Sequence, residues 1–186
     1  MNKLTIRKAT HDDAIWISDE IEKAAREGHF SETLTDDFQR MGMIAQIIVH
    51  GVLPILKLRN GKAKPELLPA DLWVADIGNS HAGFLLSLFE YSRLKPTAVE
   101  LHLGGVANHC RLKGVFSSLV TNQILMLPTE TRIYGRCYPQ SEVAILSLKK
   151  LGFEISKRGD PTELQVYGAT VLGTRPGIKV GGVDEK

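Results

Sequence analysis

The chain has 186 residues, of which 43% are hydrophobic and 24% are charged. These values are ordinary for a soluble globular protein, and a chain of this length forms one domain that can bury a sizeable core. The 23 basic and 21 acidic residues leave a net charge of +2, which does not indicate a nucleic-acid-binding protein and excludes an acidic disordered chain.

Cysteine and histidine usage argues against two further classes of protein. Cys110 and Cys137 are not in a CxxC spacing, and the six histidines follow no ligand motif. The sequence therefore predicts neither a disulfide framework nor a metal site. The N-terminus has no apolar signal region, and polar residues interrupt the longest apolar stretch, residues 43–58. We expect a cytoplasmic protein without a membrane span.

The N-terminal part of the chain predicts a strand followed by two helices. Residues Leu4–Arg7 alternate in polarity, which indicates a strand. A helix is expected over residues 11–27, where isoleucines recur at helical spacing between a capping box and a glycine. An apolar face over residues 35–50 predicts the second helix.

Residues 51–70 are punctuated by glycine and proline and have no clear period. They predict a solvated loop or a hairpin arm, and the alternative is a lid or an acceptor-contacting loop. The basic residues of this segment are Lys57, Arg59, Lys62 and Lys64.

The second half of the chain predicts mainly strands. The expected strands are residues 72–77, 83–89, 98–103, 132–137, 153–156 and 164–171. The first two form a hairpin around the turn-forming residues 78–80, and Gly104-Gly105 ends the third.

Two helices are expected between these strands. One begins near residues 111–114 and ends near residue 125, and the other covers residues 141–151. The mixed order indicates an α/β or α+β fold on a mixed sheet. We expect a single domain over residues 1–172, followed by a glycine-rich tail over residues 173–186.

The strand, basic loop and helix around residues 98–125 carry the chemistry. A helix start leaves backbone N–H groups unpaired and bears partial positive charge. Arg111 and Lys113 add full charges there, and Gly114 allows a ligand to approach the backbone closely. These features are typical of a pyrophosphate cradle, although an ordinary connection between a strand and a helix has the same order.

This segment resembles the GCN5-related N-acetyltransferase (GNAT) family. The family's acetyl-CoA signature is Arg or Gln, two residues, Gly, one residue, then Gly or Ala, and Arg111–Phe116 follows it except at its last position. Val106 stands at the family's usual valine, and Ala144, Gly152 and Phe153 match the family's last large helix. The resemblance implies a mixed, mostly antiparallel central sheet flanked by helices, with acetyl-CoA as acyl donor.

The resemblance also implies site residues. Those expected to bind the cofactor are Leu103, Gly104, Gly105, Val106, Arg111, Leu112, Lys113, Gly114, Val115, Phe116 and Ser117. Glu100 is the candidate general base, and its alternative is a solvated or ion-paired strand carboxylate. His102 shares a strand face with Glu100 and is either a base or structural. Gly104-Gly105 is expected to form a β-bulge that opens a slot for pantetheine, or merely a turn.

Three residues depart from the family pattern. Phe116 replaces a small residue, Ser141 replaces Asn, and Leu148 replaces the tyrosine that acts as general acid in many relatives. Leucine cannot donate a proton, so Tyr138 is the candidate replacement acid. Both cysteines are expected to be unreactive.

The expected function is therefore direct transfer of an acetyl group from acetyl-CoA to an amine of a small molecule or a protein. The alternative is an acyl-CoA-binding regulatory or structural module with reduced catalysis. A nucleic-acid-directed acetyltransferase is the weakest interpretation, since only the basic residues of segment 51–70 favour it. The sequence is compatible with a homodimer.

Overall fold

The computed structural model describes residues 3–59, 62–92, 94–129, 131–156 and 171–175. Its helices are α1 (Ala14–Arg26), α2 (Asp37–His50), α3 (Val115–Leu125) and α4 (Glu142–Lys150). Its strands are β1 (Leu4–Lys8), β2 (Val52–Arg59), β3 (Lys62–Ile77), β4 (Ser80–Phe89), β5 (Ala98–Val106), β6 (Arg132–Cys137), β7 (Glu154–Ser156) and β8 (Val171–Arg175). All four predicted helices are present within a few residues of their expected bounds.

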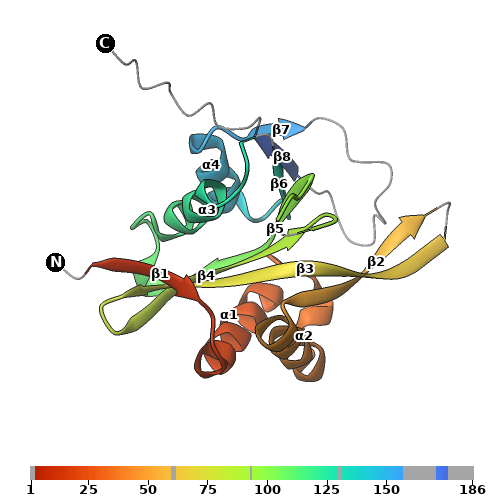
Figure 1. The fold of residues 1–186 in the computed structure, drawn as a ribbon. Helices are drawn as coiled ribbons and strands as arrows, with labels where there is room; N and C mark the ends of the chain where they lie inside the picture. Colours follow the sequence, from red (N-terminus) through yellow and green to blue (C-terminus); the bar gives the residue numbers. More distant parts are fainter. Residues whose placement is uncertain (1–2, 60–61, 93, 130, 157–170, 176–186) are drawn as a thin grey trace, which may run out of the picture.

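The strands form one eight-stranded sheet in the order β1-β3-β4-β5-β6-β8-β7, with β2 paired to β3 outside this path. All pairs are antiparallel except β5 with β6, which run parallel. Helices α1 and α2 cover one face of the sheet, and α3 and α4 cover the other (Figure 1). The prediction of a mixed, mostly antiparallel sheet flanked by helices is confirmed.

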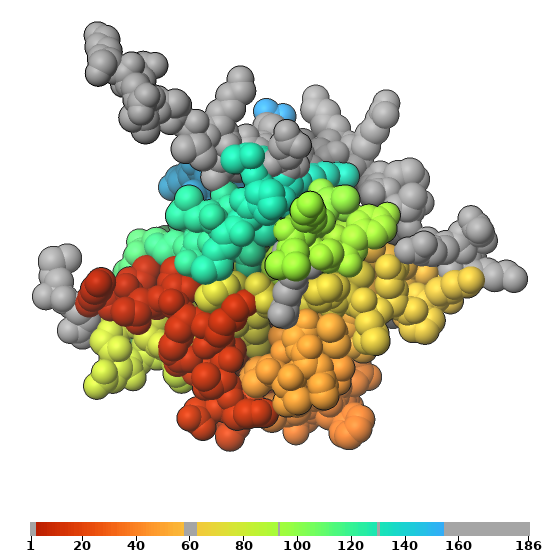
Figure 2. All heavy atoms as spheres, in the orientation of Figure 1, coloured from red at the N-terminus to blue at the C-terminus, as the bar shows by residue number. Residues whose placement is uncertain are grey.

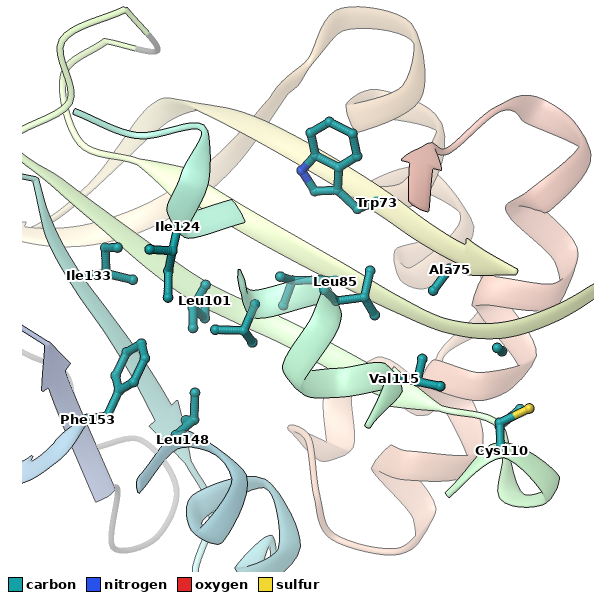
Figure 3. Close-up of a cluster of buried hydrophobic side chains, with 14 residues drawn as sticks. Trp73, Ala75, Leu85, Leu101, Cys110, Val115, Ile124, Ile133, Leu148 and Phe153 are labelled. Carbon is teal, nitrogen blue, oxygen red and sulfur yellow. The ribbon is translucent and has the colours of Figure 1, made fainter. Parts of the chain in front are cut away.

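Two hydrophobic clusters hold these layers together, one on each face of the sheet. The α1–α2 cluster contains Ile17, Ile44 and Phe84, all at most 1% exposed. The α3–α4 cluster contains Leu101, Ile133 and other side chains that converge from the strands and helices (Figure 3). The space-filling view shows the N-terminal helices in red to orange below the sheet and the α3 region in teal above it (Figure 2).

Residues 51–70 form a hairpin arm that extends the sheet beyond its body (Figure 1). β2 pairs with the first half of β3 from Val52↔Pro69 to Arg59↔Lys62. The prediction of a hairpin arm is confirmed. The strand expected over residues 72–77 is the second half of the 16-residue strand β3, and its hairpin with β4 turns through Gly78 at φ 63°.

Two expected boundaries are wrong. β5 continues through Gly104 and Gly105 to Val106, because the glycines pair with Leu85 and Phe84 of β4. β8 pairs with β6 over residues 171–175, so it includes the first residues assigned to the C-terminal tail. The strand expected over residues 164–171 lies outside the described residues except for its last position, as do residues 176–186.

Candidate active site

The two parallel strands β5 and β6 separate part-way along their length. Their pairing runs from Ala98↔Arg132 to Leu101↔Gly135 and then stops, although β5 continues to Val106 and β6 to Cys137. Within the described part of the chain, the edge of β5 that faces β6 therefore has no ladder partner beyond Leu101. Unpaired backbone N–H and C=O groups of this kind can bind an extended ligand as a strand would.

A β-bulge at His102 marks the point of separation. Leu86 and Ser87 are consecutive in β4, but their partners in β5 are Leu103 and Leu101, which leaves His102 as an extra residue. Leu101 consequently packs in the α3–α4 cluster and Leu103 in the α1–α2 cluster, although residues two apart in a regular strand share a face. The expected bulge exists, but its placement at Gly104-Gly105 is wrong.

Gly104 and Gly105 instead make room for two aromatic rings. A Cβ at Gly104 would lie 2.8 Å from the ring of Phe116, and one at Gly105 would lie 2.5 Å from the ring of Phe84. Both distances are too short for a side chain. The Phe116 ring thus packs over the backbone of β5, where it joins the margin of the α3–α4 cluster.

The N-terminus of α3 is open to an anion. Gly114 precedes α3 with φ 76°, no side chain caps the helix, and its first turn contains no acidic residue. Among the described residues, nothing accepts a hydrogen bond from the N–H groups of Val115, Phe116 and Ser117. A Cβ built at Gly114 meets no atom within 4 Å, so the approach to these groups is unobstructed.

The loop before α3 supplies exposed cations. Arg111 and Lys113 are both exposed, and Arg111 is in a weak ion pair with Glu27 at 3.8 Å. Leu112, between them, is 96% exposed and has φ 64°, a left-handed conformation that non-glycine residues rarely adopt. The structure therefore brings the helix start, the glycine and both predicted cations together.

Glu100 is the centre of a polar cluster on β5 and β6. The side chain lies on the α1–α2 face, because its partner in β4 is Leu88 of that cluster, and Glu100 is 4% exposed. It accepts hydrogen bonds from Arg136 at 2.6 Å on each oxygen. Nδ1 of His102 lies 2.7 Å from Oε1. The hydroxyl of Tyr134 donates to Oε2 at 3.4 Å.

These contacts decide the protonation state of Glu100. Burial by itself would raise its pKa, but the charges and hydrogen bonds of His102 and Arg136 outweigh burial and lower the pKa to about 2. A carboxylate this acidic has little tendency to take up a proton near neutral pH. The geometry thus favours the ion-pair interpretation of Glu100 over the general base.

The hairpin arm reaches this cluster through Lys57. Its Nζ lies 4.0 Å from Oε1 of Glu90, and that same oxygen lies 3.3 Å from the hydroxyl of Tyr134, whose one proton Glu90 and Glu100 share. The arm therefore lies against the side of the sheet on which Glu100 stands.

Two departures from the family pattern, Leu148 and Ser141, have structural explanations. Leu148 is 5% exposed and packs over Gly135 in the α3–α4 cluster, as Figure 3 shows, so it is a core residue. The hydroxyl of Ser141 lies 3.0 Å from Nδ1 of His29, which connects α4 to the segment after α1. Tyr138 follows the last residue of β6, is partly exposed, and its carbonyl accepts a hydrogen bond from the N–H of Ser141.

The cysteines lie apart from the polar cluster. Cys110 is buried in the α3–α4 cluster, and burial raises the pKa of the Cys137 thiol to about 11.

Among the described residues, no three His, Cys, Asp or Glu side chains come close enough together to hold a metal ion. No helix in the described part of the chain combines the length and apolarity needed to cross a membrane.

Comparisons with known proteins identify the architecture. No family model matches the chain, and no curated protein does. A GNAT-family acetyltransferase from Bacillus cereus ATCC 10987 is 18% identical in sequence and has a TM-score of 0.59 over 95% of this chain and 99% of its own. The structure of yncA from Salmonella typhimurium with its cofactor acetyl-CoA is 14% identical, with a TM-score of 0.62 over 94% of each chain. The paia N-acetyltransferase from Thermoplasma acidophilum, in complex with coenzyme A, is 11% identical, with a TM-score of 0.61 over 94% and 99%.

The chain has the GNAT fold. At these identities the likeness establishes the arrangement of the chain, and the residues of the site must be argued from their own geometry.

Sequence reasoning missed two members of the polar cluster. Arg136 and Tyr134 were assigned no role, although each contacts Glu100. The available signal was the alternation within strand 132–137, which places both polar side chains on the face opposite Ile133. Their partner lies 34 to 36 residues earlier in the chain, so the pairing itself requires the fold.

Proposed function

We propose that the protein is an acetyl-CoA-dependent N-acetyltransferase that transfers the acetyl group directly to an amine. The observation that carries this proposal is the uncapped N-terminus of α3 directly beyond the separated strands β5 and β6. Two structures of the same fold contain acetyl-CoA or coenzyme A, which supports the same donor here. Bound acetyl-CoA supplies the activated thioester carbonyl.

The residues of the site fit a pyrophosphate and a pantetheine arm. The free N–H groups of Val115, Phe116 and Ser117 would bind pyrophosphate oxygens, because the helix start favours negative charge. Arg111 and Lys113 would neutralise the charge of the phosphates, and Gly114 and the exposed Leu112 complete the loop between them.

The open edge of β5 would hold the pantetheine. Residues Leu103–Val106 present backbone groups toward the space left by β6. Amide groups of the ligand can pair with these groups, and one backbone N–H in this stretch would polarise the thioester carbonyl. Because Phe116 packs over Gly104, the ring supports the strand and leaves the N–H groups of α3 free.

The departure of the coenzyme A thiolate does not require a strong acid. A thiol has a pKa of about 8.5, so the thiolate of coenzyme A can leave with help from water or from the positive end of α3. Leu148 has no proton to donate, and Tyr138 would serve at most as an auxiliary donor at the end of β6. Most of the rate enhancement would come from positioning and from carbonyl polarisation.

The acceptor would enter from the side covered by α1 and α2, where Glu100 lies and where the arm contributes Lys57. An amine on a small molecule or on a protein meets this requirement. We further propose that the chain acts as a single cytoplasmic domain that includes β8 (Val171–Arg175), and a homodimer is compatible with this function.

One observation favours a second function. The position where many relatives have a catalytic tyrosine is filled by a buried core leucine, Leu148. An acyl-CoA-binding module that lacks turnover would have the same cradle and the same core. Release of free thiol from acetyl-CoA in the presence of a broad amine panel distinguishes the enzyme from the module.

Binding of acetyl-CoA tests the cradle with matched variants. Ligand that binds only the folded state raises the melting temperature, by an amount that depends on its concentration relative to Kd. Gly114→Asp should abolish this shift, because it places a carboxylate where the phosphates bind. Gly114→Asn introduces the same shape and backbone strain without the charge, and should retain part of the shift. Gly42→Asp, at an open position of α2, is the control for the added charge.

A Gly114→Asp variant that responds to acetyl-CoA as the wild type does would contradict the placement of the cradle. If wild type binds acetyl-CoA but releases no thiol with any amine, the binding module replaces the enzyme.

A further inference from the structure

His102 occupies the one place where β5 bulges, stops pairing with β6 and carries a polar cluster. We propose that His102 is the general base of the transfer and that Glu100 is the residue that positions it. This inference rests on the proposed function, since it assigns the proton acceptor of that same reaction. The sequence made Glu100 the candidate base and left His102 as either a base or a structural residue.

The tautomer of His102 follows from its partner. Arg136 contacts both oxygens of Glu100 at 2.6 Å, so the carboxylate is ionised also when His102 is neutral and can only accept hydrogen bonds. The 2.7 Å contact between Nδ1 and Oε1 therefore requires a proton on Nδ1. In the neutral ring this leaves a lone pair on Nε2, which is the form that a base needs.

The side chain of His102 is partly exposed, and only Nδ1 has a partner among the described residues. The His102 side chain is 26% exposed. Within the described part of the chain, no hydrogen bond to Nε2 is formed. Because the residue is the extra one of the bulge, it stands where the ladder to β6 ends and the open edge of β5 begins. An amine brought to the thioester at this edge would meet Nε2.

The charged and polar groups around Glu100 and His102 hold the Glu100 side chain in place. Arg136 of β6 binds both oxygens of Glu100, and the hydroxyl of Tyr134 donates to Oε2. Further out, Glu90 at the end of β4 accepts from Tyr134 and pairs with Lys57 of the arm. Glu100 is thus held at both oxygens, and its orientation fixes the imidazole ring.

The chemical step balances with these groups alone. The amine nitrogen forms the C–N bond to the thioester carbon, and the C–S bond breaks with its electron pair remaining on sulfur. The proton lost by the nitrogen goes to Nε2 of His102. It then passes to the thiolate or to water, which returns the ring to its starting state.

The first experiment compares the pH dependence of kcat/KM in matched histidine variants, using thiol release with an acceptor found in the amine panel. His102→Gln should lower kcat/KM at neutral pH by about a hundredfold or more and remove the acidic limb of the profile, while acetyl-CoA affinity changes less than about twofold. Free imidazole should restore part of the activity of His102→Ala. The control His50→Gln, at the exposed end of α2, should retain the wild-type profile.

The second experiment needs no turnover. The ¹⁵N chemical shifts of the imidazole nitrogens distinguish the two tautomers, so NMR of the wild-type protein should show the proton of His102 on Nδ1. Glu100→Gln should reduce the population of this tautomer and lower kcat/KM. Its smaller effect relative to His102→Gln would separate a positioning role from that of the base.

The outcomes separate the inference from the function on which it rests. Absence of turnover in the wild type across the panel contradicts the proposed function, and the base with it. Turnover in His102→Gln with an unchanged pH profile contradicts the base alone and leaves the acetyltransferase intact. A proton found on Nε2 of His102 in the wild type also overturns the proposal.

Discussion

Two polar clusters in this protein each combine an arginine, a carboxylate and a histidine. They differ in whether one ring nitrogen of the histidine is left without a carboxylate partner. In the first, Arg7 of β1 binds Asp13 and Asp76, and His81 of β4 lies against both carboxylates. In the second, Arg136 and His102 bind Glu100. Each cluster holds a carboxyl group that is almost completely buried and has a pKa of about 2: Asp13 in the first and Glu100 in the second.

The difference lies in the histidines. Nδ1 of His81 is 2.8 Å from Asp76, and its Nε2 is 3.6 Å from Asp13, so both ring nitrogens face carboxylates. In His102, by contrast, Nδ1 alone faces a carboxylate of the described residues. The first cluster joins the start of α1 to strands that remain paired, although β3 and β4 shift register between Ala75 and Asp76, whereas the second stands where two strands separate. An arginine, a carboxylate and a histidine therefore become a candidate site only where the sheet leaves one nitrogen free.

The largest effect is expected from breaking the first cluster. Asp13→Asn removes a buried charge that accepts hydrogen bonds from Arg7 and from the N–H of Thr10, and should lower the free energy of unfolding by about 3 kcal/mol. Arg7 remains half exposed, which limits the penalty. Urea unfolding measures the change, with the exposed neighbour variant Asp12→Asn as control. Acetyl-CoA affinity should stay within about twofold, and a loss of affinity above tenfold would show that the first cluster is also functional.

Enlarging the core on the face of the sheet opposite the second cluster should have the next largest effect. Leu148→Tyr places a hydroxyl over Gly135 in a packed site and should cost about 2 kcal/mol of stability. The control Leu146→Tyr, at an exposed position of α4, should cost less than about 0.5 kcal/mol. Thermal melts give both values. A stable Leu148→Tyr enzyme with more than tenfold higher turnover would show that a missing acid limits the wild type.

The two carboxylates should give similar acid sensitivity. Their pKa values fall from ordinary values of 3.8 for Asp13 and 4.5 for Glu100 to about 2 on folding. The stability they contribute is therefore complete above about pH 4.5 and is lost as the pH falls toward about 2. Unfolding measured across this range should show a shallower pH slope in Asp13→Asn and in Glu100→Gln than in the wild type. A wild-type slope in either variant would mean that its carboxylate is not depressed in the folded state.

The smallest effect is expected at Tyr138. Because the thiolate can leave without a strong acid, Tyr138→Phe should retain turnover within about threefold of wild type. Thiol release as a function of pH, with a thermal melt to check folding, measures it. A loss above about a hundredfold in a folded variant would identify Tyr138 as the acid.

Local patterns predicted most of the fold. Helix caps, the 78–80 turn and the alternation of strand 132–137 are encoded by neighbouring residues, and each element is present. The start of α3 with its cations was predictable for the same reason. The long strand β3 was not, because prolines interrupt any alternation in its first half, which is held in the sheet by pairing with β2 and by Leu68 in the α1–α2 cluster.

The features that local sequence patterns did not predict depend on the register between neighbouring strands. The bulge at His102 exists only because Leu86 and Ser87 of β4 pair with residues two apart in β5. The sequence placed the bulge at Gly104-Gly105, but those positions are glycine because the rings of Phe84 and Phe116 leave no room for a Cβ. The arginine that binds Glu100 comes from a strand 36 residues later, and such a partner is known only once β5 and β6 lie side by side.

A crystal structure of the protein with coenzyme A would show whether the start of α3 and the open edge of β5 form the cofactor site. Pyrophosphate oxygens should lie within hydrogen-bonding distance of the N–H groups of Val115–Ser117. The pantetheine should lie along residues Leu103–Val106, in the space where β5 has left β6, with the thiol end directed toward His102. Coenzyme A bound elsewhere on the protein, or β5 and β6 paired along their full length with the ligand absent at saturating concentration, would contradict it.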